Sequence, residues 1–129
     1  MVYALCSRMT PDELSLRLDD LACDIAVLIQ SLSTRIGSRN AYDQIVRSSS
    51  GASANYDAAR RARSRKEFIA KLGIAVEESD ETVGWFQKIV KSRYASESQV
   101  EELFGEAKQL RAILAASYAT ARRNYREAR

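Results

Sequence analysis

Residues 48–56 read Ser48-Ser49-Ser50-Gly51-Ala52-Ser53-Ala54-Asn55-Tyr56, a run that is unusually small and polar for a helix although strongly amphipathic segments flank it. Small side chains let another backbone approach closely, so this run is predicted to lie at the most crowded place in the molecule. A basic segment and then the apolar stripe of the next helix follow it. We therefore take residues 45–81 as the part of the chain around which the rest packs.

The composition favours an all-helical protein. The chain has 129 residues, of which 46% are hydrophobic, which is enough for one domain with one core. It contains one proline and only five glycines, while alanine, arginine, serine, glutamate and leucine are plentiful. This composition is typical of helices rather than of sheets. We predict a single domain over residues 1–129.

The first helix is predicted over residues 11–33. Its start is Thr10-Pro11-Asp12-Glu13, in which Thr10 caps the helix, Pro11 suits the first helical position and Glu13 completes a capping box. Gly37 marks the following turn, and residues 1–9 carry no clear pattern and are predicted to be flexible. Apolar residues recur at steps of three and four along one helical face: Leu14, Leu18, Leu21, Ile25, Leu28, Ile29 and Leu32.

Three further helices are predicted over residues 41–63, 65–93 and 98–126. Asn40 is the expected cap of the second helix, while Ser64 with Glu67 and Ser98 with Glu101 are the expected capping boxes of the other two. Short connections between long helices make neighbouring helices antiparallel. The predicted fold class is therefore all-α, an antiparallel up-down-up-down four-helix bundle.

Two of the predicted helices carry apolar residues outside the core stripe. On the first helix, Leu16, Cys23 and Val27 project roughly opposite that stripe at about 100° per residue. Ile74 and Trp85 do the same on the third helix, and an exposed tryptophan beside aliphatic residues is typical of an association patch. The alternative is scattered surface residues, which are normal singly. Because the pattern occurs on two helices, we interpret these five residues as an oligomer interface.

Basic residues gather at two places in the sequence. The turn between the second and third helices holds five of them, and the last helix adds a second group near its end. In an up-down-up-down bundle these two segments lie at the same end of the molecule. The residues of this basic pole are the candidates for nucleic-acid binding: Arg60, Arg61, Arg63, Arg65, Lys66, Arg122, Arg123 and Arg126.

The basic pole has two interpretations. A concentrated basic surface binds phosphates, and Tyr125 among the last arginines offers a ring on which a base stacks. Alternatively, basic residues are favoured at helix C-termini by the macrodipole, and charge runs often only solvate a surface. The net charge of +3 and the pI of about 9.0 do not decide between these readings. Repetition of the pole around a closed ring would strengthen its field, which favours binding.

Five polar residues are candidates for a buried network in the core, where each polar group needs a partner: Arg47, Asn55, Asp57, Glu78 and Glu81. An enzyme would use such carboxylates for acid–base catalysis. However, no nucleophile–base pair, phosphate loop or metal constellation accompanies them. We therefore interpret the network as structural, and we predict no catalytic residue, no metal site and no cofactor.

The absence of histidine removes the commonest metal ligand and the commonest general base, and it excludes the di-iron sites of helical bundles. Cys6 and Cys23 make neither a disulfide framework nor a structural zinc site, and are expected to be reduced thiols. The longest apolar run, residues 25–29, is far too short to span a membrane, and no signal peptide is visible. We expect a cytoplasmic protein without a membrane partner.

Residues 45–115 resemble a known family in several short strings that occur in order. These strings are Arg47-Ser48, residues 51–58, Ser64-Arg65-Lys66-Glu67-Phe68, Glu81-Thr82-Val83-Gly84-Trp85, Glu106-Ala107 and Leu110. They are similar to the small bacterial four-helix-bundle proteins encoded within intervening sequences of large-subunit ribosomal RNA genes. Asp57 stands where that family usually has glutamate. The first helix also lacks the family's usual tryptophan-containing opening and the Leu-Pro at its end.

The resemblance implies a four-helix bundle that assembles as a homopentamer, often with a basic surface. A structurally similar group, the accessory variability proteins of diversity-generating retroelements, forms pentameric barrels that bind a reverse transcriptase and nucleic acid. We therefore predict a non-enzymatic, homo-oligomeric bacterial protein that binds RNA or DNA through its basic pole. The alternative is a protein-interaction scaffold or accessory subunit that docks a partner protein without direct nucleic-acid contact.

Overall fold

Four helices make up the part of the chain that the computed structural model describes, residues 9–128. They are α2 (Pro11–Ser31), α3 (Ser38–Arg60), α4 (Arg65–Lys91) and α5 (Glu97–Ala128). Of the segment predicted to be flexible, residues 1–8 lie outside this range, as does Cys6. Met9 lies inside it and packs against the core.

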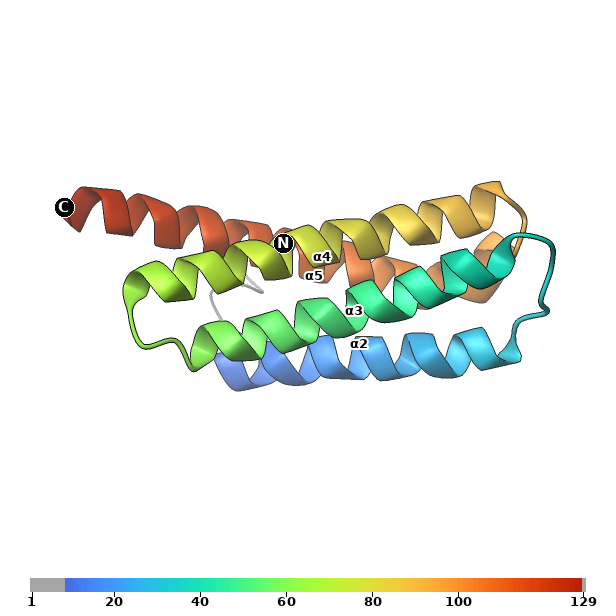
Figure 1. Cartoon of the computed structure of the whole chain (residues 1–129), viewed down its shortest axis with the longest axis horizontal. Helices are drawn as coiled ribbons and strands as arrows, with labels where there is room; N and C mark the ends of the chain where they lie inside the picture. The colour runs from blue at the N-terminus through green and yellow to red at the C-terminus, as the bar shows by residue number, and fades with distance from the viewer. Residues whose placement is uncertain (1–8, 129) are drawn as a thin grey trace.

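The helices alternate in direction and form an antiparallel up-down-up-down bundle (Figure 1), which confirms the predicted fold class. Each helix packs against its neighbours in the chain, and α2 closes the arrangement by contacting α5. The diagonal pairs, α2 with α4 and α3 with α5, make no such contact in the described residues. The turn between α3 and α4 and the end of α5 therefore lie at one end of the molecule.

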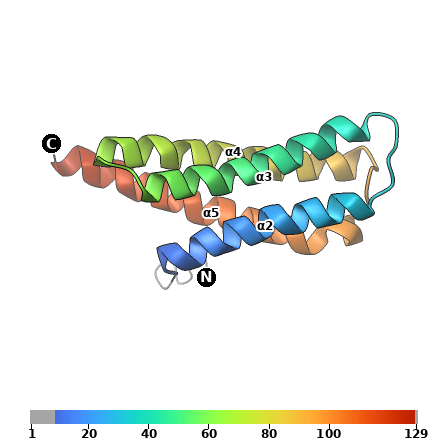
Figure 2. The same ribbon diagram turned by 60° about the horizontal axis from the view of Figure 1, so that its bottom comes forward.

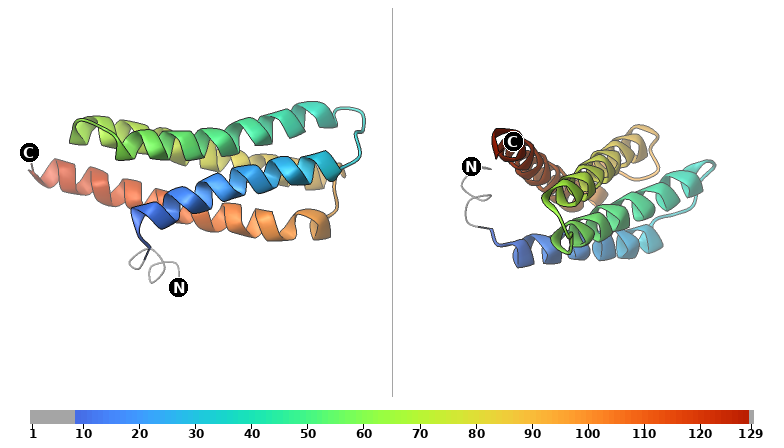
Figure 3. Two further views of the ribbon diagram at one scale, coloured as in Figure 1. Left: turned by 90° about the horizontal axis from the view of Figure 1, so that it is seen from below. Right: turned by 60° about the vertical axis from the view of Figure 1, so that its left-hand side comes forward.

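The bundle is not symmetric along its length. Helix α2 crosses α5 obliquely (Figure 3), and the last part of α5 continues past both the start of α2 and the α3–α4 turn (Figures 1 and 2). The contact between α2 and α5 is the least extensive of the four, whereas that between α3 and α4 is the most extensive. The end of α5 consequently lies beside α4 without α2 covering it.

The core follows the predicted helical faces. The largest side chains that are almost fully buried include Phe86, Leu18 and Leu110, and Ile45 and Leu72 are 0% exposed. Three of the four serines of the small stretch are buried too, Ser50 being exposed. Ser48 is 0% exposed, and its hydroxyl lies 2.8 Å from that of Thr82 on α4. Small residues on α3 therefore permit a close contact with α4, the most extensive in the bundle, where the sequence predicted only that this stretch is crowded.

The helix starts agree only partly with the predicted caps. Thr10 and Glu13 form the expected capping box: the Glu13 N–H donates to Thr10 Oγ1 at 3.1 Å, and the Glu13 carboxylate accepts from the Thr10 N–H. Ser64 accepts from the Glu67 N–H at 3.1 Å, but Glu67 accepts from the Arg63 N–H instead of that of Ser64. Ser64 and Glu67 therefore form only one of the two hydrogen bonds of a capping box.

Two predicted caps are wrong. Helix α3 begins at Ser38, three residues before the predicted start, because Gly37 adopts a φ of +85° and the Ser38 hydroxyl bonds back to the N–H and carbonyl of Arg35. Helix α5 begins at Glu97 rather than 98. Its capping box is formed by Ser96 and Gln99, because the Ser96 N–H donates to Gln99 Oε1 at 2.8 Å and the Gln99 N–H donates to Ser96 Oγ at 3.3 Å.

None of the described helices combines the length and the apolar character that crossing a bilayer requires.

Candidate nucleic-acid interface

The two basic segments of the sequence meet at the end of the bundle where α3 turns into α4 and α5 ends (Figure 1). At this end, Lys66 and Ile69 of α4 line a hollow together with Arg122, Tyr125 and Arg126 of α5. These five residues are named the basic hollow below. The predicted convergence of sequence-distant basic residues is therefore present for Lys66, Arg122 and Arg126.

Helical spacing explains why these residues share one surface. Residues three and four apart lie on the same face of a helix, as do Lys66 with Ile69, and Arg122 with Tyr125 and Arg126. The two faces meet because α4 and α5 are antiparallel neighbours. Three cations therefore surround an aliphatic side chain and an aromatic ring.

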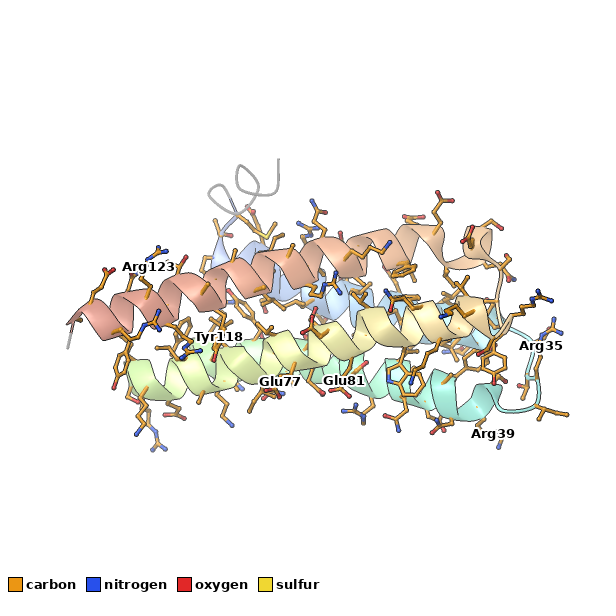
Figure 4. All side chains as sticks on the ribbon, turned by 90° about the horizontal axis from the view of Figure 1, so that it is seen from above. Arg35, Arg39, Glu77, Glu81, Tyr118 and Arg123 are labelled. Carbon is orange, nitrogen blue, oxygen red and sulfur yellow. The ribbon has the colours of Figure 1, made fainter. Side chains whose placement is uncertain are left out.

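Tyr118 forms the inner boundary of this region, one turn before Arg122. Figure 4 shows the Tyr118 side chain directed toward α4. A Cβ atom at Gly73 of α4 would lie only 3.1 Å from Tyr118 Cε1, so the glycine makes room for this ring. The guanidinium carbon of Arg122 lies 5.7 Å from the Tyr118 ring centroid, within the range of a cation–π contact. The contact orients Arg122 at the edge of the basic hollow.

Two residues of the basic pole, Arg60 and Arg63, form ion pairs with carboxylates. Arg60 Nη2 donates to Asp12 Oδ1 at 2.6 Å, which ties α3 to α2, and this hydrogen bond raises the pKa of Arg60. Arg63 Nε lies 3.9 Å from Glu67 Oε2 in an exposed pair. The remaining six residues form no ion pair with the described carboxylates: Arg61, Arg65, Lys66, Arg122, Arg123 and Arg126.

The six remaining cations do not all face the basic hollow. Arg61 and Arg65 are exposed near the α3–α4 turn. Figure 4 shows Arg123 on the side of α5 opposite to Tyr118, so it points away from the hollow. The structure thus divides the predicted set into three residues that line the hollow and others that lie around it.

The predicted buried polar network is corrected by the structure. Arg47 Nη1 lies 3.0 Å from Glu78 Oε2, and Arg47 Nη2 lies 2.8 Å from Glu81 Oε1, but the Arg47 and Glu81 side chains are 49% and 46% exposed. The three residues form a cluster on the surface where α3 meets α4. Removing three charges from water would be costly, and at this edge Arg47 and Glu81 keep much of their hydration, whereas the Glu78 side chain is only 14% exposed.

Asn55 and Asp57 do not join this cluster. The Asn55 amide donates to the carbonyl of Gly51 at 2.8 Å, within α3. Asp57 accepts a short hydrogen bond from the hydroxyl of Ser15 on α2. Both residues are half-buried and face different neighbours, because positions two apart on a helix project in different directions.

The two carboxylates of the surface cluster differ in acidity. Burial raises the pKa of Glu78 above its ordinary value of 4.5, and its contact with Glu81 raises it further. The hydrogen bond with Glu78 lowers the pKa of Glu81 below the same value. The hydrogen bonds with Glu78 raise the pKa of Arg47. Glu78 therefore takes up a proton before Glu81 as the pH falls.

The candidate interface residues lie mostly on the surface of the single chain. Leu16 is 61% exposed and Val27 is 65% exposed, and Cys23 between them is exposed as well. Ile74 is 39% exposed on α4. Trp85 is half-buried and packs against the core, with Lys88 Nζ 4.6 Å from its ring centroid. The α2 residues are the more accessible part of the set.

The polar contact between α2 and α5 was not predicted from the sequence. Arg17 on α2 donates to both oxygens of Glu106 on α5, at 2.9 and 2.6 Å, and to Gln109 Oε1 at 2.8 Å. The hydrogen bond with Glu106 raises the pKa of Arg17. Glu106 belongs to one of the strings that carry the family resemblance, so the sequence singled out the α5 partner of this contact. Nothing in the sequence paired it with Arg17, which lies 89 positions away.

Within residues 9–128, no group of three or more cysteine or acidic side chains is placed to hold a metal ion.

The chain was compared with known proteins. A family model described as 23S rRNA-intervening sequence protein matches residues 16–116. The crystal structure of a protein of unknown function from the S23 ribosomal protein family of Bacteroides thetaiotaomicron is similar, with a TM-score of 0.75 and 25% sequence identity. The match covers 86% of this chain and 99% of that one. No curated protein matches the chain.

Proposed function

Because this chain belongs to the family of 23S rRNA-intervening sequence proteins, we propose that it is a non-enzymatic homo-oligomer that binds RNA or DNA through its basic pole. The basic hollow is the observation that carries the proposal. It brings Lys66 together with Arg122 and Arg126 from the other end of the sequence, around Ile69 and Tyr125, and no carboxylate lines it.

The absence of ion pairs to described carboxylates at the residues of the basic hollow supports phosphate binding. A cation that already pairs with a carboxylate has less to gain from a phosphate, and Arg60 and Arg63 are in that state. Lys66, Arg122 and Arg126 are not paired with a described carboxylate. Each phosphate contact releases condensed counterions, so the affinity falls steeply as salt rises.

Assembly would amplify this effect. Leu16 and Val27 leave large aliphatic side chains in water on the outer side of α2, and the family resemblance implies a homopentamer. Burial of such side chains is favourable by roughly 1.5–3 kcal/mol each when complete. A closed ring repeats the basic pole once per subunit on the same side, which strengthens the attraction for a polyanion.

A second candidate function is the docking of a partner protein on the exposed face of α2. The exposed Leu16 and Val27 favour it equally, because an apolar patch serves a foreign partner as well as a second copy. Purification of the protein with one other protein and without nucleic acid would favour this candidate.

Charge reversal at the basic hollow tests the proposed function. The double variant Lys66→Glu/Arg126→Glu should weaken binding of a mixed-sequence RNA or DNA by about 10-fold or more at low salt, and should reduce the salt slope by about two. The measurement is a fluorescence-anisotropy titration at several salt concentrations.

The matched control is Arg35→Glu/Arg39→Glu. This variant changes the net charge equally, but its residues lie at the opposite end of the bundle (Figure 4). The control should bind within about 2-fold of wild type at moderate salt, because charges beyond a Debye length of about 10 Å are largely screened. Equal losses in both variants would mean that the overall charge, rather than the basic pole, attracts the nucleic acid.

A further inference from the structure

The basic hollow combines two kinds of surface that a plain phosphate site does not need. Lys66, Arg122 and Arg126 supply positive charge, while Ile69 and Tyr125 supply carbon surface between them. Ile69 and Tyr125 are each half-buried, so part of both side chains remains accessible. A ligand that fills this hollow therefore needs an apolar, flat portion as well as a negative charge.

Double-stranded nucleic acid does not offer that combination. A duplex presents phosphates and groove edges, while the flat faces of its bases are covered by stacking. An unpaired nucleotide presents both an accessible base face and a phosphate. Aromatic side chains within a positively charged groove are the recurrent means of binding single strands without sequence preference.

We infer that the basic hollow holds an unpaired base of single-stranded RNA or DNA against Tyr125 and Ile69, with its flanking phosphates on Lys66, Arg122 and Arg126. This inference rests on the proposed function and deepens it, because it names the class of nucleic acid. The strand lies over the seam between α4 and α5, where α2 does not cover it.

The neighbouring side chains extend the same surface inward. Gly73 admits the ring of Tyr118 to the seam, and Arg122 lies over that ring. An arginine guanidinium is itself flat and stacks on bases as well as pairing with phosphate. Arg122, held over the Tyr118 ring, and Tyr125 thus provide two flat groups about one turn apart on α5, which suits a strand whose bases follow one another.

Four ligands of equal length test the inference on the wild-type protein: single-stranded RNA, single-stranded DNA, the DNA duplex of the same sequence, and an abasic strand that keeps the phosphates. The two single strands should bind about 5-fold to 150-fold more tightly than the abasic strand, which is the range for one stacked base. The duplex should bind more weakly than either single strand. The RNA and DNA arms show which sugar the site prefers.

Tyr125→Ala provides the second arm, with Tyr125→Phe as the matched control. The alanine variant should lose about 5-fold or more in affinity for the single strands and nothing for the abasic strand, whereas the phenylalanine variant should bind like wild type. Thermal unfolding by circular dichroism checks that both variants fold. The comparison among the four ligands uses only the wild-type protein, so it does not depend on whether a variant folds.

The outcomes separate the two claims. Equal binding of abasic and base-containing strands, or tighter binding of the duplex, would overturn the base contact while leaving phosphate binding by the basic pole intact. Failure of all four ligands to bind would overturn the proposed function itself. Tighter binding of the single strands that depends on the ring of Tyr125 would support both claims.

Discussion

Gly51 illustrates what a single small residue does in this molecule. A Cβ atom at this position would lie 2.9 Å from Glu78 Cδ, so the absent side chain leaves the space that the Glu78 carboxylate occupies. From there Glu78 accepts from Arg47 at 3.0 and 3.3 Å. The small stretch therefore supports two kinds of contact with α4: buried hydroxyls inside the bundle and a surface ion-pair cluster at its edge.

Gly84 and Gly105 do not make room for another side chain within the single chain. A Cβ atom at Gly84 or Gly105 would meet nothing within 4 Å outside the helix's own backbone and adjoining residues. Alanine is favoured over glycine inside a helix by about 1 kcal/mol. Gly84→Ala and Gly105→Ala should each increase the free energy of unfolding by roughly 0.5–1 kcal/mol, measured by urea denaturation. If Gly84→Ala destabilises while Gly105→Ala stabilises, a subunit packs against Gly84.

The two neighbouring carboxylates should respond oppositely to pH. The raised pKa of Glu78 means that its contribution to stability is present below its ordinary pKa of 4.5 and is lost as the pH rises through its folded value. The lowered pKa of Glu81 means that its contribution is present above 4.5 and is lost as the pH falls. The free energy of unfolding of Glu78→Gln, taken relative to that of wild type, should therefore increase when the pH is raised from about 3.5 to about 7. The same relative free energy of Glu81→Gln should decrease over this change in pH.

Urea denaturation of both variants and wild type at the two pH values measures this difference. Shifts of the same sign in Glu78→Gln and Glu81→Gln would contradict the assignment.

At the scale of the helices, the contact between α2 and α5 is supported by the polar contacts of Arg17. The packing of α2 against α5 is the least extensive in the bundle, and Arg17 reaches across to Glu106 and Gln109. Hydrogen bonds to charged groups stabilise by about 1.5–3 kcal/mol, less where water screens them. Arg17→Met should lower the free energy of unfolding by about 1–2 kcal/mol. Arg111→Met, which removes an exposed contact of 3.8 Å to Asp80, should change it by less than about 0.5 kcal/mol.

Urea denaturation compares these two variants. Equal effects would show that the distance and burial of the Arg17 contact do not matter.

Helix positions were predictable from the sequence, whereas helix ends were predictable only in part. The spacing of Leu14, Leu18 and Leu21 places α2 on the core without knowledge of its neighbours, because periodicity is a local property. The start of α3 depends instead on the left-handed backbone of Gly37. The start of α5 depends on which of two nearby serines, Ser96 or Ser98, bonds to the helix, and both fit a capping pattern.

Long-range pairing was predictable only where topology alone determines it. The antiparallel order brings the start of α4 and the end of α5 to the same end of the bundle, whereas helix rotation decides that Arg122 and Arg126, and not Arg123, face Lys66 (Figure 4). The partner of Arg17 and the exposure of Arg47 depend on how the helices are rotated and spaced. A list of polar residues does not contain that information, which is why the predicted buried network is a surface cluster.

For the whole molecule, the outer side of α2 is the surface through which we propose that copies associate. The double variant Leu16→Asp/Val27→Asp should lower the mass of the oligomer, because it places charges in an interface that would otherwise exclude water. Both residues are exposed in the single chain, so the fold should survive, unlike in Trp85→Ala, which removes a residue that packs on the core. Ala115→Asp/Thr120→Asp, which adds the same charge at two exposed positions of α5 away from the outer side of α2, is the control.

Light scattering on gel filtration measures this mass. An unchanged mass in Leu16→Asp/Val27→Asp would exclude the outer side of α2 as the interface.

The most direct test of the proposed assembly and its ligand is light scattering on gel filtration with absorbance read at about 260 and 280 nm on the same peak. We predict a mass several times that of the 14.4 kDa chain, with co-eluting nucleic acid that is lost at high salt. A monomer of 14.4 kDa that carries no nucleic acid at low salt would contradict the account.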